Sequence, residues 1–140
     1  MKLIPVEEND RYVLSVDEEI SLVCFKWESN FLSKDIFKEV VSHLSEFVLN
    51  KKPSFLLIDS RKSNITITDE IQKWHDDTIV PRYIDANIKG MAVLNSESIF
   101  SDITHKKTFG KEKAKQSLKT EFFSDEKEAL DWFNNLQSFN

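Results

Sequence analysis

The polar residues best placed to do chemistry follow a short apolar stretch in the middle of the chain. Residues 55–58 are Phe-Leu-Leu-Ile, and Asp59, Ser60, Arg61 and Ser63 come directly after them. Consecutive apolar residues are typical of a strand covered on both faces, so Asp59 is predicted to end a buried strand. Its carboxylate could have a functional role, or it could shape the loop by accepting backbone N–H bonds or pairing with Arg61.

Phosphorylation of Asp59 is disfavoured by the ends of the other predicted strands. A phospho-accepting aspartate in such a position needs paired acids after the first strand and a lysine after the last. Residues 25–29 read Phe-Lys-Trp-Glu-Ser and residues 121–124 read Glu-Phe-Phe-Ser, so neither partner is supplied. Magnesium-dependent phosphoryl transfer to Asp59 is therefore not expected.

The remaining reactive side chains do not form a catalytic or metal-binding set. His43, His75 and His105 fall in separate predicted elements, without a carboxylate or thiol at ligand spacing. Cys24, the single cysteine, lies in an apolar run, where a buried core thiol is expected. The two glycines stand apart, whereas a phosphate-cradling loop needs clustered glycines. These observations predict a protein that is not an enzyme and has no metal and no cofactor.

Composition narrows the possible partners. The chain has 140 residues, 19 basic and 24 acidic, and a formal net charge of −5, which argues against a dedicated nucleic-acid binder. Its unbroken apolar runs, such as residues 55–58 and 91–94, are far shorter than the roughly 20 residues of a membrane-spanning helix. Residues 1–8 lack the apolar stretch of a signal peptide. A cytoplasmic location and no integral membrane segment are expected.

The spacing of apolar residues predicts alternating strands and helices. Two strands at 12–16 and 20–27 are expected to form a hairpin. A helix capped by Ser33 follows, and Thr68 begins a second helix that Pro81 interrupts or restarts. Further strands are predicted at 55–58, 91–94 and 118–123, and Ser124 is expected to cap a last helix with Ala129, Trp132, Phe133 and Leu136 on its inner face.

This order predicts an α/β fold in a single compact domain over residues 11–137, with residues 1–10 as an N-terminal extension. The sheet is expected to be mixed, mostly parallel and five-stranded, with an N-terminal antiparallel hairpin and about four helices. Binding sites in such sheets lie beyond the carboxyl ends of the parallel strands. Two groups of residues qualify: a polar patch of Asp59, Ser60, Arg61, Ser63 and Trp74, and an apolar pocket near Trp27, Phe31, Trp74 and Phe100.

Several short motifs in this order resemble the STAS superfamily (sulfate transporter and anti-sigma-factor antagonist), in particular its SpoIIAA-like, or STAS/Sec14-like, bacterial branch. The resemblance covers roughly residues 11–136. It is carried by Leu57-Ile58-Asp59-Ser60-Arg61, Gln72-Lys73-Trp74, Ile79-Val80-Pro81, Lys89-Gly90-Met91-Ala92-Val93, Phe122-Phe123-Ser124-Asp125 and Glu128-Ala129-Leu130-Asp131-Trp132. It implies a strand–helix fold without catalysis and a role in protein partner switching or ligand sensing.

The chain departs from that family at the phosphorylation motif. Anti-sigma antagonists carry Asp-Ser-Ser-Gly or Asp-Ser-Thr-Gly after this strand, and the second hydroxyl accepts a phosphoryl group. Here Asp59 and Ser60 match, but Arg61 stands at the acceptor position and no glycine follows. Ser60 or Ser63 could substitute as the acceptor, yet the motif is not intact.

Two functional hypotheses follow. The first is a non-enzymatic regulatory domain that binds an unidentified protein through the polar patch around Asp59 and Arg61. The alternative is a module that binds a small apolar ligand, a lipid or metabolite, in the aromatic pocket. The oligomeric state is left open: an exposed edge strand at residues 12–16 either pairs across a two-fold axis in a homodimer or is blunted by the flanking charges of Arg11, Asp17 and Glu18. The lysine-rich residues 106–119 are either a solvated face or a docking surface.

Overall fold

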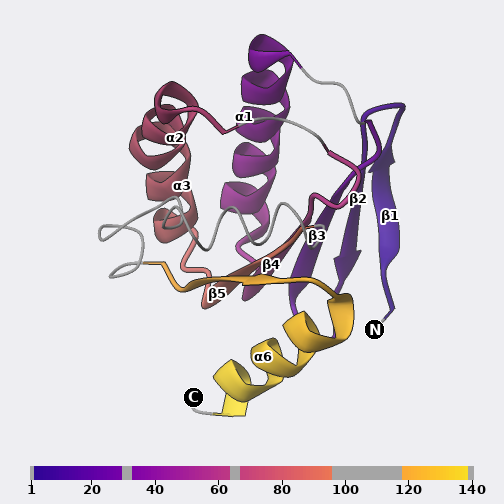
Figure 1. Cartoon of the computed structure of the whole chain (residues 1–140). Coiled ribbons are helices and arrows are strands. Elements are labelled where there is room, and N and C mark those ends of the chain that lie inside the picture. Colours follow the sequence, from indigo (N-terminus) through magenta and orange to yellow (C-terminus); the bar gives the residue numbers. More distant parts are fainter. Residues whose placement is uncertain (1, 30–32, 64–66, 96–117, 139–140) are drawn as a thin grey trace.

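The computed structural model describes residues 2–29, 33–63, 67–95 and 118–138 (Figure 1). Six strands form one sheet in the order of the sequence, β1-β2-β3-β4-β5-β6. Their bounds are β1 Ile4–Glu8, β2 Tyr12–Asp17, β3 Leu22–Trp27, β4 Phe55–Asp59, β5 Gly90–Leu94 and β6 Thr120–Phe123. The helices are α1 Lys34–Lys51, α2 Asp69–Trp74, the π-turn η1 His75–Ile79, α3 Val80–Asp85 and α6 Glu126–Ser138.

The sheet is mixed, as the sequence predicts. Strands β1, β2 and β3 are antiparallel from one to the next, and β3, β4, β5 and β6 run parallel to one another. Parallel neighbours need a crossover, and α1 and the α2–η1–α3 segment supply two of these connections. The α/β fold and the N-terminal antiparallel hairpin are therefore confirmed.

The sheet has one strand more than the five expected, because β1 lies within the residues assigned to an N-terminal extension. Four of its five side chains are exposed, Ile4 and Val6 among them. It also contains Pro5, and its pairing with β2 shifts register between Pro5 and Glu7. Such a short edge strand with a proline and charged residues lacks the alternating apolar pattern by which strands are recognised.

Strand β1 also changes the expectation about the sheet edge. The strand starting at Tyr12 was expected to be an exposed edge available for dimer pairing, but β1 covers it along four paired positions. Glu7 links β1 to both the neighbouring strand and the neighbouring helix. Its carboxylate accepts a hydrogen bond from the Tyr12 hydroxyl on β2 and lies 2.8 Å from His43 Nε2 on α1. The edge strand on this side of the sheet is therefore β1, which contains Pro5 and a shift in register.

Helix α1 begins where Ser33 predicts it. The Ser33 hydroxyl accepts a hydrogen bond from the Ile36 backbone N–H at 3.1 Å, and Asp35 lies in the first turn near the positive end of the helix dipole. The helix buries one apolar stripe against the sheet, namely Phe37, Val40, Val41, Leu44 and Val48.

Replacing Ser33 by alanine is expected to lower the free energy of unfolding by about 1 kcal/mol, because the Ile36 N–H loses its acceptor at an exposed helix end. Urea titration measures this change. Ser33→Asp, which restores a capping acceptor, is expected to recover most of the loss. Equal stability of the alanine and aspartate variants would show that the cap contributes nothing.

The second helical segment is continuous but changes its hydrogen-bonding pattern near Pro81. Thr68 caps α2 as predicted, with its hydroxyl 3.2 Å from the Ile71 N–H. In η1 the Val80 N–H donates to the His75 carbonyl, five residues earlier. Pro81, in the first turn of α3, has no N–H to donate, so the regular α-helical ladder cannot run through this position. The proline thus sits in an otherwise continuous helix and is accompanied by a wider turn.

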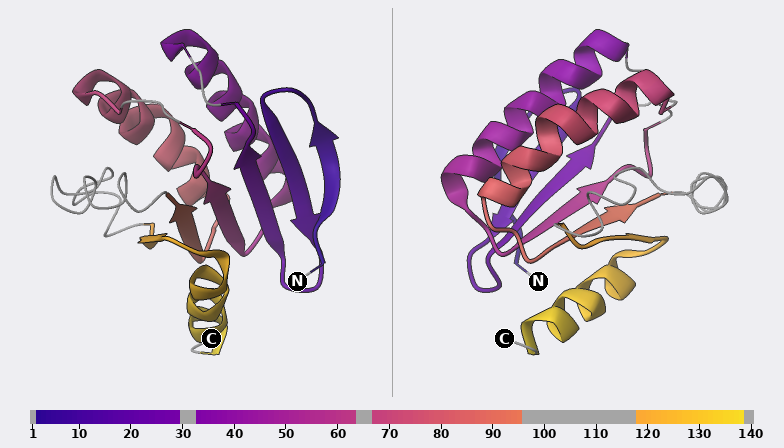
Figure 2. Two further views of the ribbon diagram at one scale, coloured as in Figure 1. Left: turned by 45° about the vertical axis from the view of Figure 1, so that its right-hand side comes forward. Right: turned by 90° about the vertical axis from the view of Figure 1, so that its left-hand side faces the viewer.

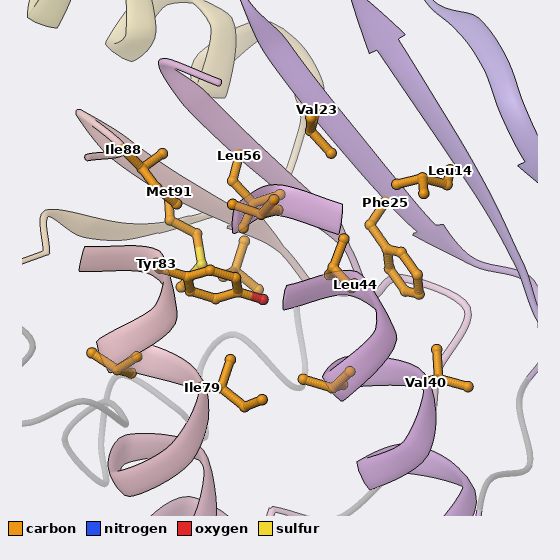
Figure 3. Packing of buried hydrophobic residues seen from close by; sticks show 14 of the residues in the cluster. Leu14, Val23, Phe25, Val40, Leu44, Leu56, Ile79, Tyr83, Ile88 and Met91 are labelled. Carbon is orange, nitrogen blue, oxygen red and sulfur yellow. The ribbon is translucent and has the colours of Figure 1, made fainter. Parts of the chain in front are cut away.

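The two faces of the sheet carry separate apolar clusters. Helices α1, α2 and α3 cover one face, and α6 lies against the other (Figures 1 and 2). On the first face, the labelled side chains of Phe25, Leu44, Tyr83 and Met91 lie together between sheet and helices (Figure 3). On the second, Phe55 and Phe133 stack with ring centroids 4.7 Å apart.

The cap of helix α6 (Glu126–Ser138) lies one residue later than predicted. Asp125, not Ser124, accepts the hydrogen bond from the Glu128 N–H, at 2.9 Å. The helix crosses close to the start of β5, where Gly90 leaves room for it: a Cβ added to Gly90 would lie 2.7 Å from the Leu136 side chain and 3.1 Å from Trp132. The glycine is required there by the close approach of the helix.

Candidate functional site

The carboxyl ends of β3, β4 and β5 lie side by side, and the predicted polar patch is centred on the end of β4. Lys26, Asp59 and Leu94 occupy adjacent register positions there. The backbone ladder extends one residue further, because the Ser60 N–H donates to the Leu94 carbonyl and the Asn95 N–H to the Phe123 carbonyl. Ser60 and Asn95 therefore continue the strand pairing by one residue, and Arg61 and Lys62 then form a turn.

Asp59 and Arg61 form a tight, two-pronged ion pair at this edge. Arg61 Nε donates to Asp59 Oδ1 at 2.9 Å and Nη2 donates to Oδ2 at 2.8 Å, while the Arg61 backbone N–H also donates to Oδ1 at 3.1 Å. The Asp59 side chain is 7% exposed and that of Arg61 is 39% exposed. The shaping role that the sequence allowed for Asp59 is thus present, since it both pairs with Arg61 and accepts a backbone bond.

The pair holds Asp59 in its charged form. Burial alone would raise the pKa of the Asp59 carboxyl, but the hydrogen bonds and charge of Arg61 outweigh burial and lower that pKa below its usual range. The same bonds raise the pKa of Arg61, and the nearby Asp125 and Glu126 at the start of α6 add to this. An ionised carboxylate with both oxygens occupied is a poor general acid or base.

Strand alternation divides the predicted patch between the two faces of the sheet. Side chains two residues apart in a strand lie on the same face of the sheet. Asp59 therefore shares a face with Leu57, which packs in the cluster under α6. Ser60 shares a face with Ile58, on the side covered by α1 and α3. Ser63 is buried, and its N–H donates to the Ser60 carbonyl at 3.1 Å. Trp74 lies on α2, with its ring 6.4 Å from that of Phe37 and 5.5 Å from Lys38 Nζ. Of the five residues of the predicted patch, Asp59 and Arg61 are in contact with each other. The other three, Ser60, Ser63 and Trp74, do not belong to the surface that this pair forms.

Two further cations lie beside the pair. Lys62 Nζ is 2.7 Å from Glu28 Oε2, and Lys26 Nζ is 3.8 Å from Glu28 Oε1. Hydrogen bonding to Lys62 lowers the pKa of Glu28. The surface at the ends of β3 and β4 therefore combines Lys26, Glu28, Arg61 and Lys62, and it is referred to below as the β3–β4 charged patch.

The face under α1 and α3 contains a small cavity of about 70 Å³. Its walls come from three strands and three helical segments, and they are mainly aromatic and aliphatic. The lining residues are Phe25, Trp27, Phe37, Val41, Leu44, Ile58, Ser60, His75, Tyr83, Met91 and Val93. Of the residues predicted to form an apolar pocket, Trp27 lines this cavity and Trp74 does not. Phe31 and Phe100 lie outside the described residues, as does most of the lysine-rich stretch at 106–119.

Two residues that line this cavity, Tyr83 and His75, were not predicted as site residues, and neither was the buried Asn95 after β5. Tyr83 is buried, and burial raises the pKa of its hydroxyl. Asn95 is 4% exposed, and its Nδ2 has no hydrogen-bond partner in the part of the chain that the structure describes. Asn95 could have been included in the prediction, because it is a polar residue directly after the predicted strand at 91–94 and binding sites were expected at strand ends.

Other expectations about reactive groups can be compared with the described residues. Cys24 is buried, as expected, and burial raises the pKa of its thiol to about 12, so the thiolate is not formed at neutral pH. No three described histidine, cysteine, aspartate or glutamate side chains are grouped so as to hold a metal ion. Among the same residues, no helix combines the length and apolar character needed to cross a membrane.

Comparison of the chain with protein-family models, curated proteins and solved structures gives no significant match. The resemblance to the STAS superfamily therefore stays a prediction that rests on the motifs of the sequence.

Proposed function

We propose that the chain is a non-enzymatic regulatory domain, of the kind that its STAS-like motifs indicate, and that it binds another protein through the β3–β4 charged patch. The observation that carries the proposal is the geometry of Arg61. Its side chain is 39% exposed, yet two of its nitrogen atoms are fixed by the buried carboxylate of Asp59. The remaining guanidinium N–H groups are held in one orientation for an external acceptor.

Preorganisation is the physical reason to expect binding at this arginine. An arginine that is already ordered loses little side-chain entropy when a partner binds, and arginine is enriched among the residues that dominate interface energies. Lys26 and Lys62 are themselves both paired with Glu28, so the patch offers donors without a large excess of positive charge. This arrangement suits a partner that presents carboxylate or carbonyl oxygens.

The dimensions of the cavity favour this proposal over the alternative of a lipid or a large metabolite. Sites that enclose drug-sized ligands have volumes of roughly 300–1,000 Å³. The cavity under α1 and α3 measures about 70 Å³, several times less. The engaged state of Asp59 likewise supports a binding role rather than acid–base chemistry at this strand end.

The test is comparative capture of partners from the source cells with the full chain as bait. Arg61→Gln removes the charge and the two-pronged bond, and it is expected to reduce recovery of a specific partner by about 30-fold, the effect of a dominant interface residue. Arg61→Lys retains the charge but cannot form the planar fork, so an intermediate recovery is expected.

Lys73→Gln is the matched control, because Lys73 is an exposed cation that also pairs with an acid, Asp77, but lies on α2. It should retain every partner of the unmodified chain. The urea midpoint of each bait must be measured, since loss of Arg61 also affects folding. Equal recovery of every captured protein by the unmodified chain and a folded Arg61→Gln variant would overturn the proposal.

A further inference from the structure

The cavity of about 70 Å³ between the sheet and helices α1 and α3 is lined mainly by apolar side chains. Phe25 and Met91 lie on its sheet side, and Leu44 and Tyr83 face them from the two helices (Figure 3). No lysine, arginine, aspartate or glutamate is among the described residues that line it. An ionised ligand would lose its hydration there without gaining a counter-charge, so the walls favour uncharged molecules.

Tyr83 places a hydrogen-bonding group among these apolar walls. The residue is 1% exposed, and Figure 3 shows its hydroxyl directed towards Leu44, which also lines the cavity. Burial raises the pKa of this hydroxyl and the charge of Arg82 opposes the rise, but no hydrogen bond contributes. Among the described residues, the Tyr83 hydroxyl therefore has no hydrogen-bond partner. A buried tyrosine usually gives its O–H an acceptor, and leaving the group unpaired is costly, so this hydroxyl calls for a specific explanation.

The other tyrosine of the chain shows the usual arrangement. Tyr12 is also buried, at 7% exposed, but its hydroxyl donates to the Glu7 carboxylate. Tyr12 is not among the residues that line the cavity. The hydroxyl of Tyr12 is thus used by the fold, whereas the hydroxyl of Tyr83 is available inside the cavity.

The π-turn η1 positions Tyr83 beside a second polar residue of the cavity wall, His75. In a regular α-helix, residues eight positions apart are about 80° apart around the axis, whereas residues seven apart are separated by only about 20°. The π-turn between His75 and Tyr83 takes up one extra residue and so brings the two side chains nearly into line. Their rings lie 6.5 Å apart, and both line the cavity. Single π-turns within helices occur frequently at functional sites.

We infer that this cavity binds a compact, uncharged molecule with one acceptor oxygen, such as a short ketone, aldehyde or alcohol, and that the Tyr83 O–H donates to that oxygen. The size of the molecule follows from volume: a cavity of roughly 150 Å³ holds benzene, so about 70 Å³ suits a molecule of roughly three or four heavy atoms. Its apolar part contacts Phe25, Leu44 and Met91. The site lies on the face of the sheet opposite Asp59, and it does not depend on the function proposed for the β3–β4 charged patch.

Acetone and isobutene are matched probes for this site, because they share one shape and differ by an oxygen in place of a CH₂ group. Each is titrated into the full-length protein and into Tyr83→Phe, which removes only the hydroxyl, while the methyl resonances of Leu44 and Met91 are followed by NMR. We expect saturable shifts with both probes at millimolar concentrations in the unmodified chain. Tyr83→Phe should weaken acetone about tenfold, the effect of one lost hydrogen bond, and leave the affinity for isobutene unchanged or higher.

Tyr12→Phe is the matched control, because it removes a hydroxyl that is hydrogen-bonded and lies outside the cavity. It should lower the urea midpoint and leave the affinity for acetone unchanged. Tyr83→Phe should do the reverse, with a urea midpoint that is unchanged or higher, because the hydroxyl that it removes has no partner to lose. A lower midpoint in Tyr83→Phe would show that this hydroxyl has a structural role and would overturn the inference.

Two further readings locate the probes. Val93→Ile adds one carbon to the cavity wall and should weaken both probes. The methyl resonance of Ala129, which is buried on the opposite face beneath α6, should not shift. Absence of saturable shifts at Leu44 and Met91, an undiminished affinity for acetone in Tyr83→Phe, or an equal loss of both probes in that variant would each overturn the inference.

Discussion

Replacing Phe133 by alanine is expected to lower the free energy of unfolding by about 3–5 kcal/mol, the usual cost of removing a fully buried aromatic side chain. Phe133 is 1% exposed and is stacked on Phe55, which is also 1% exposed. Among the described residues the cluster beneath α6 has eight buried members, so few buried neighbours can close the resulting cavity. Urea denaturation followed by circular dichroism measures the loss.

Asn135→Ala is the matched control for Phe133→Ala, because Asn135 is an exposed residue on the same helix. A change within about 0.5 kcal/mol is expected for such a surface position. A loss below about 1 kcal/mol in Phe133→Ala would show that α6 contributes little to the cooperative unit, since cavity formation under a packed helix cannot be so small.

The strongly periodic elements could be predicted from the sequence for a clear physical reason. In α1, the apolar residues that recur between Ile36 and Val48 match the helical period, and Ser33 supplies the cap, so local and tertiary preferences agree. The buried strands β4 and β5 are apolar at consecutive positions because both faces of the sheet are covered there. Predictions of this kind depend only on which residues are buried, and the spacing of apolar residues in the sequence indicates this directly.

Strand β1 could not be predicted, because its stability comes from a partner rather than from its own pattern. Its backbone pairs with β2, but most of its side chains remain in solvent, so no apolar period appears in residues 4–8. The contact between Glu7 and His43 joins residues 36 positions apart, and the sequence around either residue does not indicate it. An edge strand of this type can be predicted only when the position of the neighbouring strand is already known.

The end of a buried strand at Asp59 was predicted correctly, but the arrangement of the side chains that follow it was not. The strand end after Ile58 was identified correctly, and the pairing of Asp59 with Arg61 was one of the two arrangements that the sequence allowed. Treating residues 59–63 as one patch ignored the alternation of strand side chains, which sends Asp59 and Ser60 to opposite faces. One strand end therefore supplies two different surfaces, a charged one beside α6 and an apolar one beneath α1.

The charged pair at this strand end makes an acid-dependent contribution to folding. Replacing Asp59 by asparagine keeps the shape of the side chain but removes its charge, and it is expected to lower the free energy of unfolding at pH 7 by about 2 kcal/mol. This value lies below the 3–5 kcal/mol for breaking a fully buried ion pair, because Arg61 is partly exposed to solvent. Urea titrations of both proteins at pH 7 provide the measurement.

The sign of the pH dependence follows from the direction of the pKa shift. The pKa of Asp59 is lower in the folded chain than in the unfolded chain, where it is about 3.9. The stabilisation is therefore complete above that unfolded value and is lost as the pH falls through the lower, folded value. Carboxyls other than Asp59 titrate in both proteins, so the difference between the unmodified chain and Asp59→Asn isolates this group. That difference should be constant from pH 7 to about pH 5 and should shrink steadily below about pH 4. A difference near zero at pH 7 would mean that the shape of Asp59, and not its charge, holds Arg61 in place, and a constant difference at all pH values would mean that ionisation of the Asp59 carboxyl is not its cause.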